Sequence, residues 1–259
     1  MVTDQPVAGP AACAYLVAEG AAEPVEGWDF SWFAGRATEE RPAWGYSRLL
    51  GERMADAKVA LDVQTGGGEV LAGIRHPPPV LVATESWPPN IGVARRNLHP
   101  LGAAVVAAAD DDGLPFRGES FDLVVSRHPI VAVWAEIARV LRPDGTYLSQ
   151  QVGAGSNREL TDFMMGAQPV DSARSARMAV AGAQEAGLAV ADLREQALRV
   201  EFHDVGAVVH FLRKVPWTVP GFTVDGYADQ LARMHRRIRS SGPFVSHAQR
   251  FLIEARKLR

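Results

Sequence analysis

The stretch KVALDVQTGGGEVLAGI, residues 58–74, decides the fold class of this chain. An apolar run ends on Asp62, three glycines follow at 66–68, and a helix is expected from about Glu69. Glycine lets the backbone turn sharply and lets a ligand approach it closely. A glycine-rich turn between a strand and a helix is where a doubly wound sheet binds a nucleotide, because the helix N-terminus offers free N–H groups.

Beyond residue 58 the chain alternates between short β-branched runs and helical stretches, up to about residue 170. This order predicts an α/β fold, a doubly wound and mostly parallel seven-stranded sheet of the Rossmann-like kind with helices on both faces. Right-handed crossovers place the carboxyl ends of the parallel strands along one edge. The alternating run FVSHAQRFLIEARK, residues 244–257, is expected to form an antiparallel last strand.

The domain organisation is expected to be simple. Residues 1–57 are predicted to form a helical lid segment, and residues 58–259 one ligand-binding domain with a substrate-shaping insertion at about 203–243. Aromatic side chains gather in the lid segment, where they either close over a ligand or pack against the sheet. They are Trp28, Phe30, Trp32, Trp44 and Tyr46.

Composition excludes several classes of protein. The 259 residues contain one cysteine, so neither a disulfide framework nor a cysteine zinc site can form within the chain. The histidines form no metal-binding spacing, so no metal is expected. No apolar run reaches the ~18–20 residues of a membrane span, and the N-terminus lacks a signal peptide. We therefore expect a complete cytoplasmic protein, either a monomer or a homodimer.

Charge is unevenly distributed. The net charge is −3, yet residues 231–259 carry eight Lys or Arg against one acid, Glu254. Such asymmetry indicates either an anionic partner or a solvated helix face. Arg233, Arg236 and Arg237 have the spacing of one helix face, which is the basis of an RNA-binding alternative.

Two cofactor classes compete for the glycine loop. The dinucleotide fingerprint G-x-G-x-x-G fails because its third glycine falls on Leu71. DVQTGGG instead resembles the first motif of the class I S-adenosylmethionine (SAM)-dependent methyltransferases, D-x-G-x-G-x-G, with a departure at Gln64. The resemblance implies that this loop binds SAM through Asp62, Gln64, Thr65, Gly66 and Gly68.

Three further motifs extend the resemblance over residues 58–152. VLVATE ends on Glu85, where an acid can accept hydrogen bonds from both ribose hydroxyls. AAADDDGLPFRGESFDLVV is similar to the family segment D-A-x-x-L-P-F-x-x-x-x-F-D-x-V, and EIARVLRPDG to E-x-x-R-V-L-K-P-G-G. The resemblance implies that Asp110 contacts the adenine amino group and that Asp111 supplies neighbouring backbone. The cofactor residues expected from these strands are Glu85, Ser86, Asp110, Asp111 and Ser126.

The resemblance also narrows within the family. WDFSW, TGGGE, SRHP and KVPWTVPGF look like a bacterial subfamily of unassigned substrate. PDGTYLSQQVGAGSNREL is similar to the large-subunit rRNA guanine methyltransferases, whose four-cysteine zinc finger this chain cannot make. We therefore expect transfer to a small-molecule acceptor, with S-adenosylhomocysteine as product. An RNA base methyltransferase and a non-catalytic SAM-binding protein are the alternatives.

Methyl transfer is an in-line displacement that needs alignment and exclusion of water, and a base only where the acceptor is protonated. His128 is the candidate base and Arg127 the candidate partner of an anionic substrate, unless they cap the strand end or face solvent. One of Gln150 and Gln151 is expected to contact substrate or cofactor, because side chains alternate along a strand. The candidate substrate contacts are Trp44, Tyr46, Gln151, Trp217 and Phe222.

Gln64 is the sharpest test of this interpretation. Its backbone can line the methionine pocket if its φ is ordinary, whereas a glutamine held at positive φ would be strained. A Gln64 side chain that filled the SAM site would exclude the interpretation of the loop.

Overall fold

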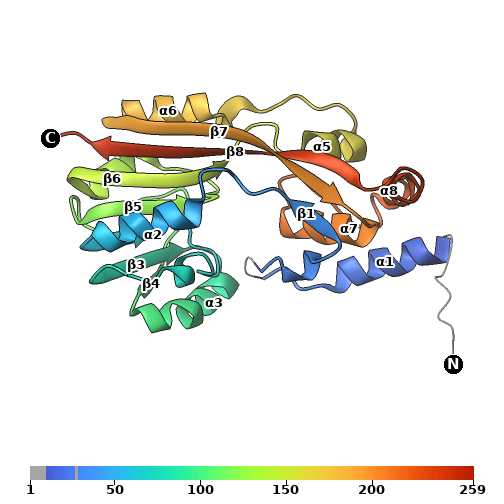
Figure 1. The fold of residues 1–259 in the computed structure, drawn as a ribbon, viewed down its shortest axis with the longest axis horizontal. Coiled ribbons are helices and arrows are strands. Elements are labelled where there is room, and N and C mark those ends of the chain that lie inside the picture. Colours follow the sequence, from blue (N-terminus) through green and yellow to red (C-terminus); the bar gives the residue numbers. More distant parts are fainter. Residues whose placement is uncertain (1–9, 27–28) are drawn as a thin grey trace. The chain divides into compact units, whose positions relative to one another are not determined.

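The computed structural model describes residues 10–26 and 29–259 (Figure 1). The expectations that concern the first nine residues and Trp28 lie outside this range. The chain divides into two compact units, which are described separately. The larger unit contains residues 41–155, 171–197 and 249–259; the smaller contains the described residues up to 40, with 156–170 and 198–248.

The larger unit is built on the predicted parallel sheet. The strand pairs β2–β3, β3–β4, β2–β5 and β5–β6 are parallel, and β8 pairs antiparallel with β6. The sheet has the strand order β1-β7-β8-β6-β5-β2-β3-β4. The strands are β1 (Ala37–Glu39), β2 (Val59–Asp62), β3 (Val80–Glu85), β4 (Ala104–Ala107), β5 (Phe121–Arg127), β6 (Leu141–Val152), β7 (Leu188–Phe202) and β8 (Phe244–Lys257). The predicted fold class and the antiparallel last strand are confirmed.

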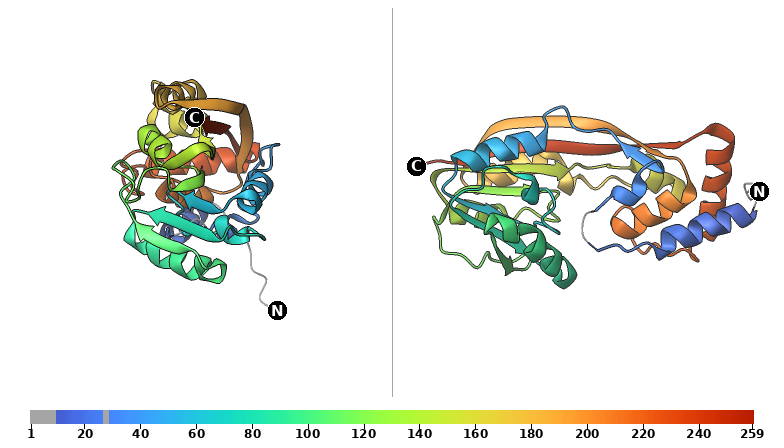
Figure 2. Two further views of the ribbon diagram at one scale, coloured as in Figure 1. Left: turned by 90° about the vertical axis from the view of Figure 1, so that its left-hand side faces the viewer. Right: turned by 60° about the horizontal axis from the view of Figure 1, so that its bottom comes forward.

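Alternating strand residues send side chains to opposite faces of this sheet. On one face, Ala60 and Val125 pack with α2 (Tyr46–Asp56) and α3 (Pro88–Leu98). On the other, Leu61 and Val124 pack with α4 (Trp134–Val140) and α6 (Ala176–Glu185). Figure 2 shows the larger unit from two further sides. The strands are therefore covered on both faces, and ligand access is left to the ends of the strands.

The smaller unit has its own hydrophobic core. Strand β1 pairs antiparallel with the end of β7, and the core gathers around Phe202, Val208 and Met234. Gly206 allows close helix contact, because a Cβ there would lie 2.5 Å from the carbonyl oxygen of Leu16. The helices of this unit are α1 (Pro10–Ala22), α5 (Arg158–Met165), α7 (Val205–Lys214) and α8 (Ala228–Ser241).

Three features differ from the sequence-based expectation. The sheet has eight strands rather than seven, because the three residues of β1 add a strand within the expected lid segment. Helix α7 replaces irregular chain, with Asp204 capping it through a bond from the Ala207 N–H group. Residues 66–70 form turns, and only the short 3₁₀ helix Leu71–Gly73 follows the glycine loop. The helix expected from Glu69 is absent, since its stretch holds glycines that disfavour helix.

No helix among the described residues combines the length and the apolar composition that a membrane crossing requires.

Candidate functional site

The glycine loop joins β2 to the turns before α3 and is fixed largely by internal contacts. Asp62, the last residue of β2, accepts a hydrogen bond from the Thr65 hydroxyl through Oδ2 at 2.7 Å. Gly66 and Gly68 have φ of 64° and 77°, which explains why glycine is used at both positions. A Cβ on Gly68 would also lie 2.8 Å from Cγ of Leu98 in α3. Gly68 is therefore required by packing, whatever the loop binds.

The backbone N–H group of Gly66 is not free. It donates to Oε2 of Glu85 at 2.8 Å, while Oε1 of Glu85 accepts from the Trp87 N–H group at 3.0 Å. Because no α-helix follows the loop, the expected row of free N–H groups at a helix N-terminus is absent. The expectation of a helix N-terminus with free N–H groups at this loop was wrong.

Gln64 departs furthest from expectation. Its φ is 58°, so the residue is held in the strained conformation rather than the ordinary one. Its side-chain amide bridges two loops: Oε1 accepts from the Ile130 N–H group at 2.6 Å, and Nε2 donates to the carbonyl oxygens of Val131 at 2.8 Å and Asp110 at 3.3 Å. These bonds to the loops after β4 and β5 hold the residue in its strained conformation.

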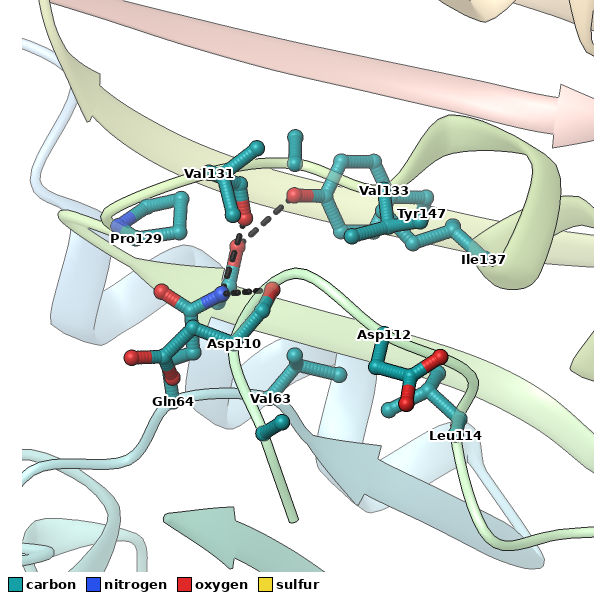
Figure 3. A pocket seen from close by; sticks show the side chains of 13 residues that line it. Val63, Gln64, Asp110, Asp112, Leu114, Pro129, Val131, Val133, Ile137 and Tyr147 are labelled. Carbon is teal, nitrogen blue, oxygen red and sulfur yellow. Dashed lines mark hydrogen bonds between the residues drawn. The ribbon is translucent and has the colours of Figure 1, made fainter. Parts of the chain in front are cut away.

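The amide of Gln64 lines a pocket at this edge of the sheet (Figure 3). The pocket has about 320 Å³ of space between its lining atoms, and this figure includes space open to solvent. Its thirteen lining residues are Val63, Gln64, Ala109, Asp110, Asp112, Leu114, Ser126, Pro129, Val131, Ala132, Val133, Ile137 and Tyr147.

Acidic side chains end three neighbouring strands. Asp62 and Glu85 are the last residues of β2 and β3, and Asp110 follows β4 by three residues. The Ser86 hydroxyl donates to Oδ2 of Asp110 at 2.8 Å, whereas Asp111 is exposed. The structure thus brings four of the expected cofactor residues to one edge and leaves Asp111 at the surface.

Burial changes the protonation of these acids. Asp62 is 8% exposed, and its desolvation raises its pKa from 3.8 to about 7, although the bond from Thr65 opposes the change. Desolvation also raises the pKa of Glu85, against the bonds from Trp87 and Gly66. Buried carboxyls with raised pKa values are suited to a cationic ligand, which would favour their charged forms.

The end of β5 holds a buried hydroxyl cluster. Ser126 is 1% exposed, and its Oγ lies 2.7 Å from the Tyr147 hydroxyl and 2.9 Å from Oγ of Ser149. Its carbonyl oxygen accepts from the Tyr46 hydroxyl at 3.0 Å. Ser126 therefore lines the pocket as part of an internal network, and Tyr46, a substrate candidate, is bonded within the same network.

Arg127 and His128 follow Ser126 at the same edge. Arg127 is exposed, while His128 is half-buried and has φ of 55°. Nε2 of His128 lies 3.0 Å from Nε2 of Gln150. Desolvation lowers the pKa of His128 well below 6.5, and the charges of Arg127 and Arg250 lower it further. His128 is therefore neutral at physiological pH.

The other substrate candidates are Trp44, Gln151, Trp217 and Phe222, and their environments differ. Trp44, 5% exposed, donates through Nε1 to Oε1 of Gln150 at 2.8 Å, so it packs inside rather than closing over a ligand. Gln151 has a buried Nε2 without a hydrogen-bond partner among the described residues. Trp217 and Phe222 belong to the smaller unit, where Phe222 packs against the core.

Sequence reasoning missed the role of Glu136 and Arg139. Arg139 donates to the carbonyl oxygens of Leu114 at 2.9 Å and Phe116 at 2.8 Å, and Glu136 accepts from the Leu114 N–H group at 2.7 Å. The two side chains also bond each other at 2.6 Å. The motifs L-P-F and E-x-x-R are thus contact partners. The presence of both motifs in one sequence was the signal from which this contact could have been predicted.

The donor set fits SAM in part. Asp62 offers a buried carboxyl to a cation, and Glu85 and Asp110 offer acceptors to hydroxyl and amino groups. Gln64 does not fit, since its amide bonds the loops on both sides of the pocket. Within the described ranges, no three His, Cys, Asp or Glu side chains gather closely enough to hold a metal ion.

Comparison with known proteins concerns the domain and the fold. Residues 61–149 match a family model described as a methyltransferase domain, while no curated protein matches the chain in sequence. A candidate methyltransferase from Bacillus halodurans C-125 is 19% identical with a TM-score of 0.58, over 83% of this chain and 100% of its own. The YcgJ protein from Bacillus subtilis is 19% identical with a TM-score of 0.57, over 83% and 99%.

A geranyl diphosphate methyltransferase in complex with SAM is 13% identical with a TM-score of 0.50, over 82% and 84% of the two chains. At these identities the likeness establishes the fold alone, which is Rossmann-like.

Proposed function

We propose that this chain, which carries a methyltransferase domain at residues 61–149, transfers a methyl group from SAM to a small-molecule acceptor and yields S-adenosylhomocysteine. The observation that carries the proposal is the row of acids Asp62, Glu85 and Asp110 at the ends of three adjacent parallel strands. In an open α/β sheet, ligands bind beyond the carboxyl ends of the strands.

In this proposal each acid binds a different group of SAM. Asp62 holds the ammonium group of SAM, Glu85 the ribose hydroxyls and Asp110 the adenine amino group, with Thr65, Ser86 and the loop glycines around them. SAM supplies an electrophilic methyl group on a sulfonium. A carboxylate at Asp62 is favoured by that cationic ligand, because an opposite charge lowers the pKa of an acid.

Gln64 has to move in this proposal. Its amide holds the loops after β4 and β5 with three hydrogen bonds and lines the pocket at this edge of the sheet. We infer that SAM replaces the Gln64 amide at these loops. Gln64 is then a residue that SAM displaces, rather than a residue that lines SAM through its backbone.

In this proposal the acceptor binds at the end of β5. Arg127 and His128 lie at this end, where Arg127 can pair with an anionic acceptor and His128 can contact the reacting group. The lid at residues 1–57 and the substrate-shaping insertion at about 203–243 stay predictions from the sequence. In this proposal the protein works in the cytoplasm as a monomer or homodimer.

RNA is the second candidate acceptor, and the basic helix α8 gives it limited support. Arg233 stacks over Phe163 at 5.3 Å, and Arg237 over Phe244 at 5.3 Å. These contacts within the smaller unit give both arginines a structural role.

Ligand-induced stabilisation tests the cofactor first. SAM at 100 times its Kd should stabilise the folded protein by about 2.7 kcal/mol and raise its Tm, while NAD should not. An unchanged Tm at saturating SAM would reject the proposal. Radiolabelled SAM with separated small-molecule and RNA fractions of a cell extract then identifies the acceptor class. Binding without any labelled product indicates a non-catalytic SAM-binding protein.

A further inference from the structure

Trp44, Gln150 and His128 form a hydrogen-bonded chain whose proton positions can be deduced. Indole Nε1 only donates, so the atom of Gln150 that lies 2.8 Å from it must be the carbonyl oxygen Oε1. The amide nitrogen of Gln150 consequently faces His128. An amide –NH₂ group only donates, so Nε2 of His128 is the acceptor and carries no proton. Neutral His128 therefore carries its proton on Nδ1.

The surroundings favour this neutral form. Trp44 and Gln150 are 5% and 3% exposed, so water cannot easily replace either partner. Protonation of Nε2 would place two donors against each other at 3.0 Å. The charged groups that face His128 are Arg127 and Arg250, and both disfavour an imidazolium.

Gln150 also fixes the backbone of His128. The His128 N–H group donates to the Gln150 carbonyl oxygen at 2.7 Å, at the φ of 55°. One residue thus holds both the ring and the main chain of His128. Nδ1 makes no hydrogen bond within the described part of the chain, and the ring is only half-buried.

We propose that Trp44 and Gln150 are positioning residues that hold His128 as a neutral hydrogen-bond donor, which presents Nδ1–H to the methyl acceptor. The role of Nδ1–H toward a methyl acceptor rests on the proposed function, whereas the protonation state of the His128 ring does not. It assigns the substrate class: the acceptor molecule carries a carbonyl, carboxylate or other hydrogen-bond-accepting atom at His128.

The inference also states where the protons and electrons go during methyl transfer. The acceptor's own lone pair forms the bond to the methyl carbon, while the carbon–sulfur bond breaks with its electrons on sulfur. No proton passes to His128, because its only unprotonated nitrogen is occupied by Gln150. The nucleophile therefore arrives with an available lone pair, and any proton that it loses goes to solvent.

Histidine ¹⁵N NMR tests the ring directly, with His128→Gln to assign the signal. Wild-type His128 is expected to show a protonated Nδ1 and an unprotonated Nε2, and to keep this neutral form as the pH falls through 6.5. In Gln150→Glu, one carboxylate oxygen still accepts the hydrogen bond from Nε1 of Trp44. The other carboxylate oxygen replaces the amide –NH₂ group and therefore requires a donor on His128. The proton should move to Nε2, and the pKa of His128 should rise. Trp44→Phe releases the Gln150 amide, so both tautomers should appear.

The exposed His99 is the internal control, and its ¹⁵N signals should be the same in the wild type and in the variants. A wild-type Nε2–H tautomer, titration of His128 near pH 6.5, or an unchanged tautomer in Gln150→Glu would overturn the inference. Failure of the proposed function is distinguishable, because the NMR result does not depend on SAM or on methyl transfer. Where transfer is measurable, Gln150→Glu should add an acidic limb to the pH profile of kcat/KM that the wild type lacks.

Discussion

Replacing Gln64 by alanine or by glycine separates the two contributions of this residue to the loop after β2. Alanine removes the three amide hydrogen bonds and keeps the strained φ of 58°, while glycine removes both. Two of the bonds are short, at 2.6 and 2.8 Å, and each contributes about 1 kcal/mol. Left-handed backbone costs a non-glycine residue about 1 kcal/mol.

The structure therefore predicts an order of stability. Gln64→Ala should lose about 2 kcal/mol of unfolding free energy, and Gln64→Gly about 1 kcal/mol, because glycine relieves the strain. Urea denaturation without ligand measures both values. Gln184→Ala is the matched control, since that side chain is exposed on α6 and should change stability by less than about 0.5 kcal/mol.

The same variants test whether SAM displaces the amide. If about 2 kcal/mol of hydrogen bonding no longer has to be broken, both variants should bind SAM about 10- to 30-fold more tightly by calorimetry. Weaker SAM binding in both would refute the reasoning, because the amide would then be ordering the loops for the cofactor. A glycine variant less stable than the alanine variant would refute the argument from φ.

The remaining predictions concern Asp62, Gly68 and Arg139. The folded-state pKa of Asp62, about 7, lies above the unfolded value of 3.8, so its stabilisation is complete below pH 3.8 and is lost as pH rises through 7. Unfolding free energy should fall by as much as about 4 kcal/mol more over that range in wild type than in Asp62→Asn. Gly68→Ala should cost about 2 kcal/mol or more in urea melts, since Cβ would meet Leu98, whereas Gly73→Ala, with open space around it, should be nearly neutral. Arg139→Met should lower the Tm through a loss of about 1–3 kcal/mol, because it leaves the Leu114 and Phe116 carbonyls without their donor; an equal effect of Arg142→Met, whose side chain is more exposed, would contradict this.

The sheet and its functional edge could be predicted because both follow from local patterns. β-branched runs and the residues just beyond them indicate where strands end, which placed Glu85 and Asp110 correctly at one edge. The absence of a long helix after the glycine loop could not be predicted from the strand-then-glycine pattern alone. Gly73 and the prolines from Pro77 onward stop the helix after one 3₁₀ turn.

The protonation state and orientation of the His128 ring could not be predicted from any local sequence pattern. Its ring is held through Gln150 by Trp44, and these last two residues are 106 positions apart in the chain. Aromatic residues before the first parallel strand suggested a lid, but burial converted Trp44 into an internal donor. Non-local contacts of this kind depend on how the elements pack, which residue spacing does not encode.

The bonds of Glu136 and Arg139 to the turn at Leu114 and Phe116 have a practical consequence for chimeric enzymes. The turn follows β4 and the two charged residues lie on α4, so the two segments are separated in the chain by the whole of β5. A loop from a relative, grafted at 110–118 alone, would arrive without the side chains that hold its carbonyl groups. The turn and α4 should therefore be exchanged as one cassette.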